Sequence, residues 1–184
     1  CLGSWVGGTI VGEKLIAISG HGEALQWWDE LPRTTEEGKN NVPVLPRVGH
    51  RWRGGDGNDV TYAGGKLFVV EYNGGRVSVY DELPSGPSVK PDWSLGSSSP
   101  EVNPYYENWI IQNGVPASNG KRLFIASDFD SSLSVWNKIP AESGVKPDLF
   151  YRRFSDAPWD ISVYGDTVFL AGNKGIYGWE KFDG

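Results

Sequence analysis

Short apolar runs alternate with turn residues along the chain, and one combination of the two recurs. An aliphatic run of four residues is followed, after a polar or Gly-bearing turn, by a shorter run that ends in an aromatic residue. Complete copies close on a Pro and span residues 15–32, 67–84 and 123–140, and an incomplete copy spans 168–179. Repetition at this scale indicates a unit that buries its apolar faces only against its neighbours.

Each copy resolves into short strands. In residues 77–80 (VSVY) alternate side chains face opposite sides, whereas residues 67–70 (LFVV) are apolar on both sides, as expected for a strand covered on both faces. A strand also precedes each aliphatic run, and we expect these first strands at 8–11, 59–62, 115–118 and 160–163. The less regular fourth strands are expected at 42–45, 92–95 and 148–151. The pattern predicts an all-β fold of four-stranded antiparallel blades, which is a β-propeller.

The repeat divides the chain into about four blades of about 45 to 56 residues. As one domain or propeller fragment, the units cover approximately 5–57, 58–113, 114–158 and 159–184. Residues 2–4 (LGS) match 95–97 at the end of a fourth strand, so the sequence is out of phase with its blades. The sequence therefore corresponds either to a closed four-bladed ring or to part of a ring of about six to eight blades. Because an unclosed ring exposes apolar edges, we favour a larger ring that is closed by further blades or by self-association.

The composition agrees with this fold and excludes some functions. The 25 Gly, 12 Pro and 24 aromatic residues suit short strands and tight turns, and no stretch sustains a helical apolar period. A net charge of −6 argues against a nucleic-acid surface, and no apolar run reaches the about 20 residues of a membrane span. Cys1 has no partner for a disulfide; it either marks a lipidated N-terminus or simply begins the chain, and we expect an extracellular or periplasmic protein.

Residues 67–80 (LFVVEYNGGRVSVY) resemble the NHL-type propeller repeat, in which an aliphatic strand, an acidic residue and a turn precede Arg-Val-x-Val-aromatic. Residues 137–140 (NKIP) and 146–148 (KPD) resemble a bacterial NHL-like subgroup. The resemblance implies a propeller fold, and its members include binding scaffolds, sensors and a few enzymes. The acidic residue is Glu71 but is replaced at Ser19, Ser127 and Gly172, and the Arg occurs only as Arg76.

The loops that enter the innermost strands carry the candidate chemistry. Each brings a Trp together with polar groups to the mouth of the central channel, and such surfaces suit a sugar or a small polar ligand. The alternative is that the Trp residues cap the core between blades. The candidate ligand-binding residues are Arg51, Trp52, Asp59, Trp109, Asn113, Arg153, Trp159 and Asp160.

Metal binding and catalysis have less support. Asp56, Asn58 and Asp59 resemble a calcium loop, without its twelve-residue frame and closing Glu. The two His residues, His21 and His50, fall in different loops. We therefore predict a non-enzymatic NHL-like binding scaffold that presents its channel-mouth loops to a protein or carbohydrate ligand. The alternatives are a calcium-dependent propeller hydrolase or lactonase, and a propeller fragment whose main property is assembly into an oligomeric ring.

Overall fold

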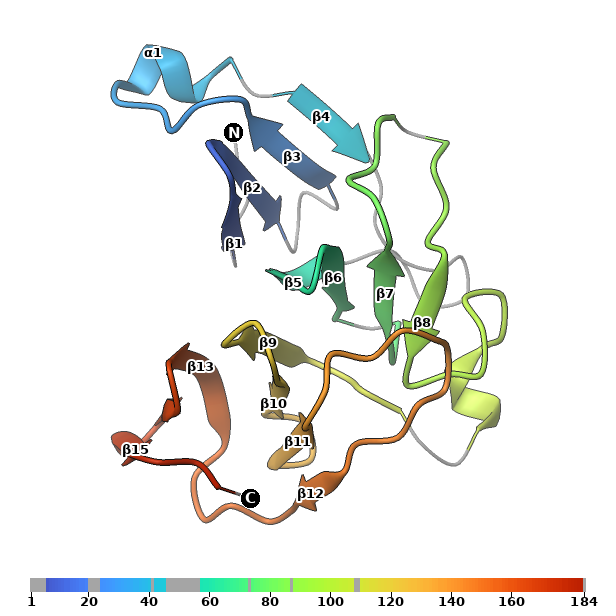
Figure 1. Cartoon of the computed structure of the whole chain (residues 1–184), viewed down its shortest axis with the longest axis vertical. Coiled ribbons are helices and arrows are strands. Elements are labelled where there is room, and N and C mark those ends of the chain that lie inside the picture. The colour runs from blue at the N-terminus through green and yellow to red at the C-terminus, as the bar shows by residue number, and fades with distance from the viewer. Residues whose placement is uncertain are drawn as a thin grey trace.

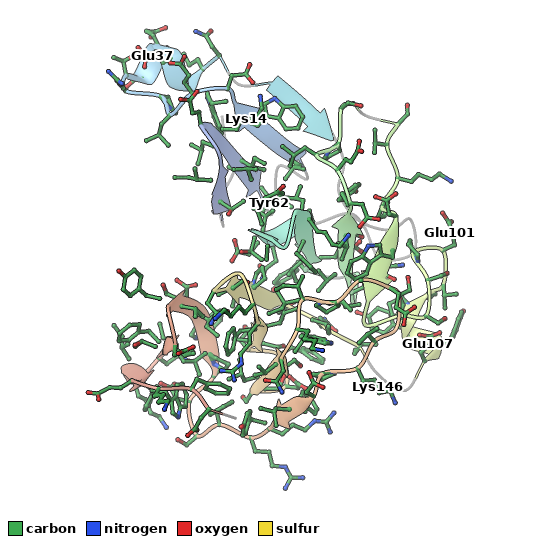
Figure 2. The ribbon with its side chains drawn as sticks, in the orientation of Figure 1. Lys14, Glu37, Tyr62, Glu101, Glu107 and Lys146 are labelled. Atoms are coloured by element: carbon green, nitrogen blue, oxygen red, sulfur yellow. The ribbon has the colours of Figure 1, made fainter. Side chains whose placement is uncertain are left out.

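The structure is a computed structural model that describes residues 6–19, 24–40, 42–45, 57–72, 74–86, 88–107 and 110–183. The described residues form separate antiparallel sheets that follow one another in an arc (Figure 1). Charged side chains such as Glu37, Glu101 and Lys146 lie at the outer margin of the molecule (Figure 2). Residues 2–4, which the sequence matches to a fourth strand, and Cys1 lie outside the described residues.

Each sheet is built from strands consecutive in sequence, which we call blades 1 to 4. Blade 1 contains β1 (Val6–Val11), β2 (Lys14–Ser19), β3 (Ala24–Trp28) and β4 (Val42–Leu45). Blade 2 contains β5 (Gly57–Ala63), β6 (Lys66–Glu71), β7 (Val77–Tyr80) and β8 (Trp93–Leu95). Blade 3 contains β9 (Gly114–Ser118), β10 (Leu123–Ser127), β11 (Ser132–Trp136) and β12 (Leu149–Tyr151). The described part of blade 4 contains β13 (Pro158–Tyr164), β14 (Thr167–Gly172) and β15 (Ile176–Trp179).

Two short helical segments lie outside the sheets. The helix α1 (Thr35–Gly38) follows β3 and begins where the Thr34 side chain accepts a hydrogen bond from the Glu37 amide. The 3-10 helix η1 (Pro104–Tyr106) precedes β9.

The order of the strands in the sheets confirms the prediction of an all-β fold of four-stranded antiparallel blades.

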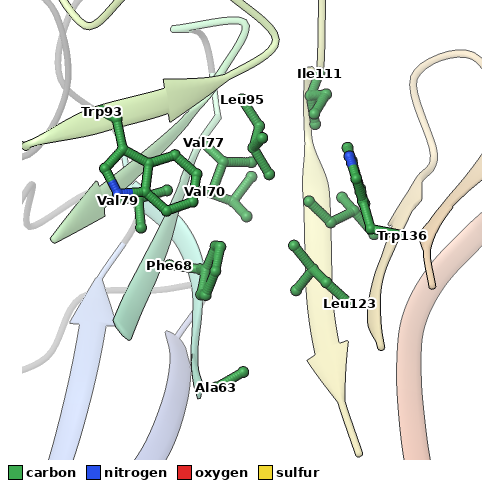
Figure 3. Close-up of a cluster of buried hydrophobic side chains, with 11 residues drawn as sticks. Ala63, Phe68, Val70, Val77, Val79, Trp93, Leu95, Ile111, Leu123 and Trp136 are labelled. Carbon is green, nitrogen blue, oxygen red and sulfur yellow. The ribbon is translucent and has the colours of Figure 1, made fainter. Parts of the chain in front are cut away.

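The core lies between blades rather than inside one sheet. In blade 2, Phe68 pairs with Val79, and this face packs on the Leu123 face of blade 3 (Figure 3). The opposite face, which carries Leu67 and Val69, packs on blade 1. The same division recurs between blades 3 and 4. The second strand of each inner blade, β6 or β10, is therefore buried on both faces.

In blade 2, the two polar positions of the repeat are occupied by a buried ion pair. Arg76 Nε lies 3.5 Å from Glu71 Oε2, and both side chains are buried. The Ser78 hydroxyl donates to Glu71 Oε1 at 2.5 Å, and Arg76 Nη1 donates to the Pro100 carbonyl at 2.5 Å. Glu71 and Arg76 are the acidic residue and the Arg of the repeated motif, and their pairing gives these two positions a structural role.

Candidate functional site

The first strand of each blade lines a common channel. β1, β5, β9 and β13 lie side by side in this order at the inner edge of the arc (Figure 1). A cavity of about 980 Å³ lies against them. Its lining includes residues of all four blades, so the channel exists only because the blades stack.

Two aspartates occupy equivalent positions in this lining. Asp59 pairs with Val70 in blade 2, and Asp160 pairs with Ala171 at the same place in blade 4. A β-bulge precedes each of them, and bulges commonly redirect side chains next to functional sites. Each carboxylate accepts a 2.8 Å hydrogen bond from the amide of the next residue. The repeat thus delivers two carboxyl groups to one cavity with the same local geometry.

The two carboxyl groups differ in their surroundings. Burial raises the pKa of Asp59 from 3.8 to about 7, the hydrogen bond from the Val60 amide opposes the rise, and the charge of Asp160 adds to it. Asp160 is exposed on the channel side. A Cβ at Gly7 of β1 would lie 1.8 Å from Asp59 Oδ1, so the glycine leaves the space that the carboxyl group fills. Near neutral pH, Asp59 therefore exists both as a hydrogen-bond donor and as an acceptor.

Amide and carboxylate oxygens of the neighbouring loops complete the polar wall. Asn113 has a left-handed backbone conformation, with φ of 52°. Its Oδ1 and the Oδ1 of Asp128 are buried and have no hydrogen-bond partner among the described residues. Burial raises the pKa of Asp128, and a hydrogen bond with the Asn113 side chain opposes the rise. Asn58 is turned to the protein instead, since its Nδ2 donates to the Gly114 carbonyl at 2.7 Å. Asn113 and Asp128 thus form a polar part of the cavity wall, although these two oxygens are themselves buried.

Aromatic side chains also line the cavity. Trp159 is the bulge residue of β13 and remains 48% exposed, and its indole Nε1 donates to Asn173 Oδ1 at 2.8 Å. Tyr72, which follows β6, lines the cavity as well and is also exposed. A fixed indole ring beside carboxyl and amide groups combines a stacking surface with hydrogen-bonding partners.

The sequence-based site residues fall into three groups. Asp59, Asn113, Trp159 and Asp160 lie around the cavity, and Asn58 lines it too. Arg153 is exposed and is not among the residues that line the cavity. Arg51, Trp52, Asp56 and Trp109 lie outside the described residues.

Tyr72 and Asp128 are among the lining residues that sequence reasoning did not select. Both stand in the turn directly after a second strand, one position beyond Glu71 and Ser127. That shared position was the available signal, but the hairpin turn offered a sufficient local explanation for an Asp there.

The described residues contain no group of three His, Cys, Asp or Glu side chains placed to hold a metal ion. The calcium site and the lactonase activity stay predictions, because Asp56 lies outside those residues. Nor does any helix in the described part of the chain have the length and apolarity needed to cross a membrane.

Comparisons with known proteins bear on the fold. No protein-family model and no curated protein matches the chain. Among solved structures, BamB from Moraxella catarrhalis is 11% identical with a TM-score of 0.53. A Chaetomium thermophilum Polycomb Repressive Complex 2 chain is 12% identical with a TM-score of 0.59, and a chain of a nidogen/laminin complex is 8% identical with a TM-score of 0.55.

The alignments cover 93%, 96% and 91% of this chain but 41%, 38% and 55% of those chains. The chain therefore spans about half the length of these structures, or less. At such low identity the likeness concerns the fold alone, and together with the sheet order it establishes the protein as a β-propeller.

Proposed function

We propose that the protein is a non-enzymatic, NHL-type β-propeller module that binds a carbohydrate at its channel. The NHL assignment rests on residues 67–80 and on the pairing of Glu71 with Arg76, which accounts for the two polar positions of that motif. The binding role rests on the cavity wall.

One observation carries the proposal. The exposed Trp159 and Asp160 side chains are adjacent in the sequence and line one cavity together with Asn113 and Asp128. A carboxylate accepts hydrogen bonds, so the wall at Asp160 suits a ligand that donates them. Sugar hydroxyl groups are such donors, and Trp159 offers an exposed ring for the apolar face of a pyranose.

A protein ligand is the second candidate. Two of the similar structures come from assemblies, namely Polycomb Repressive Complex 2 and the nidogen/laminin complex. The channel opening is formed by strand ends and turns of several blades, and such loops on a rigid scaffold commonly carry binding residues.

The test is isothermal titration calorimetry with a panel of defined neutral oligosaccharides: maltohexaose, cellohexaose, xylohexaose and chitohexaose. We expect at least one to bind, and we expect Trp159→Ala and Asp160→Ala each to weaken binding about tenfold or more, in keeping with the loss of about 1.4 kcal/mol. Tyr106→Ala is the matched control, since Tyr106 is an exposed aromatic in η1, outside the cavity lining.

Circular dichroism of each variant establishes that it is folded. If no oligosaccharide binds at millimolar concentration, or if binding survives both channel substitutions, the carbohydrate proposal is wrong. Binding of a protein that both substitutions abolish would support the second candidate instead.

A further inference from the structure

The channel wall of blade 4 brings an aromatic ring and a carboxylate to one place. In a regular strand, the neighbours Trp159 and Asp160 would point to opposite sides. The β-bulge between Pro158 and Asp160 changes this alternation, and both Trp159 and Asp160 line the cavity. Trp159 is 48% exposed and Asp160 is exposed as well. The two side chains therefore offer a ring and a negative charge to the same ligand.

The protein holds the Trp159 ring by its edge. The indole Nε1 donates a hydrogen bond to Asn173 Oδ1 at 2.8 Å, which fixes the orientation of the ring. In the described part of the chain, no lysine or arginine stacks on this ring. None of the ion pairs found there involves Asp160 either. The ring and the carboxylate are therefore both available to a cation that a ligand supplies.

The equivalent positions of blade 2 do not offer this combination. Asn58 stands at the bulge of β5, and its Nδ2 donates to the Gly114 carbonyl at 2.7 Å. Asp59 lies against Gly7 of β1 and is less exposed than Asp160. Blade 4 thus departs from blade 2 at the two positions that form the exposed part of the wall.

The charged side chains along the cavity have one sign. Asp59, Asp128 and Asp160 line it, and none of the described lining residues is a lysine, an arginine or a histidine. Burial and, after it, the charge of Asp160 raise the pKa of Asp59, so these two carboxyl groups lie close enough to repel each other. A bound cation would offset that repulsion, whereas an anionic ligand would add to it.

Hydroxyl groups accompany the carboxyl groups on both blades. Thr61 stands two positions after Asp59, and Ser162 stands two positions after Asp160 in the same register, and both line the cavity. A hydroxyl group donates and accepts hydrogen bonds, so it suits the hydroxyl groups of a sugar. A ring and a carboxylate alone would suit any amine, whereas the added hydroxyl groups favour an amine that a sugar carries.

We propose that the channel prefers carbohydrates with free amino groups, and that the ammonium group binds between the Trp159 ring and the Asp160 carboxylate. A protonated amine is attracted both to the face of an indole and to a carboxylate. An N-acetyl group or a hydroxyl group at the same place in the sugar carries no such charge. This inference rests on the proposed carbohydrate-binding function and adds to it the class of sugar.

The test compares hexaglucosamine with chitohexaose, because these two oligosaccharides differ only in N-acetylation. Isothermal titration calorimetry is carried out at mildly acidic pH, where the amino groups of hexaglucosamine are protonated. We expect the wild type to bind hexaglucosamine about tenfold more tightly than chitohexaose, or better. That preference should shrink as the salt concentration rises, since it depends on attraction between charges.

Asp160→Asn keeps the size of the side chain and a hydrogen-bond acceptor but removes the charge. We expect this variant to bind both oligosaccharides with similar affinity, close to that of the wild type for chitohexaose. Asp166→Asn is the matched control, because Asp166 is exposed in a turn of the same blade and does not line the cavity. It changes the net charge equally and should keep the preference. Circular dichroism establishes that each variant is folded.

Equal affinity of the wild type for the two oligosaccharides overturns the inference, as does a preference that Asp160→Asn retains. Loss of the preference in Asp166→Asn as well would contradict it too, because the effect would then come from net charge. Hexalysine is the third probe, and tighter binding of this peptide than of hexaglucosamine would assign the site to lysine side chains of a protein instead. Neutral oligosaccharides that bind without any preference for the amine refute this inference alone, whereas binding of no oligosaccharide refutes the proposed function as well.

Discussion

The buried Arg76–Glu71 pair offers the sharpest test of how the repeat uses its polar positions. Arg76→Met keeps much of the side-chain volume but leaves the Glu71 carboxylate buried without its countercharge. Removing one partner of a buried pair costs about 3–5 kcal/mol, whereas replacing both partners by apolar side chains is often neutral or stabilising. We therefore expect Arg76→Met to lose about 3–5 kcal/mol and the Glu71→Leu/Arg76→Met double variant to recover most of that loss.

Urea denaturation of the single and double variants at neutral pH measures these free energies of unfolding. Ser132→Ala is the matched control, because Ser132 stands at the position of Arg76 in blade 3 and is equally buried but uncharged. It should cost about 1 kcal/mol or less. Equal losses for Arg76→Met and the double variant would refute the reasoning, since the cost would then come from packing and not from the stranded charge.

Two further predictions follow from register-equivalent residues and from the channel. Phe124→Ala should cost about 3–5 kcal/mol of unfolding free energy, whereas Phe169→Ala should cost clearly less because Phe169 is 45% exposed; equal costs would contradict that exposure. Asp59 binds its proton more tightly in the folded than in the unfolded state, so stability should fall as pH rises from 4 to 7. The three-unit pKa difference corresponds to up to about 4 kcal/mol. Asp59→Asn should flatten that dependence in pH-resolved urea denaturation, and an unchanged slope would contradict it.

The blades were predictable because their strand pairing is local. In each unit, neighbouring strands are separated by short turns or loops, and the alternation of residues such as 77–80 states directly which faces are apolar. The repeat therefore predicted the position of nearly every strand. It did not predict the bulges at Asn58 and Trp159, although Gly57 and Pro158 directly precede them and were the available signal.

The site was predictable only where it lies on the repeat itself. Asp59 and Asp160 precede equivalent second strands, so the shared register places both at the channel. Asp128 reaches the cavity from a turn of blade 3, and its exposure to the channel depends on how blades stack, which the local pattern does not encode. Arg153 was predicted because it stands close to Trp159 in the sequence. It lies in a loop before β13, however, and does not line the cavity.

The burial of equivalent aromatic residues shows a different limit. Phe124 and Phe169 occupy identical positions in near-identical patterns, yet one is buried and the other exposed. Phe124 packs against residues of blade 4, so its burial depends on a neighbouring blade, and the sequence pattern predicts an apolar surface but not what covers it.

The central claim is that equivalent aspartates of two blades face one channel. The most direct measurement is an NMR titration of the ¹³C-labelled Asp59 carboxyl group in the wild type and in Asp160→Asn. We predict a pKa near 7 in the wild type and a lower one in the variant, where the neighbouring charge is gone. A pKa near 4 that does not respond to Asp160→Asn would contradict the account.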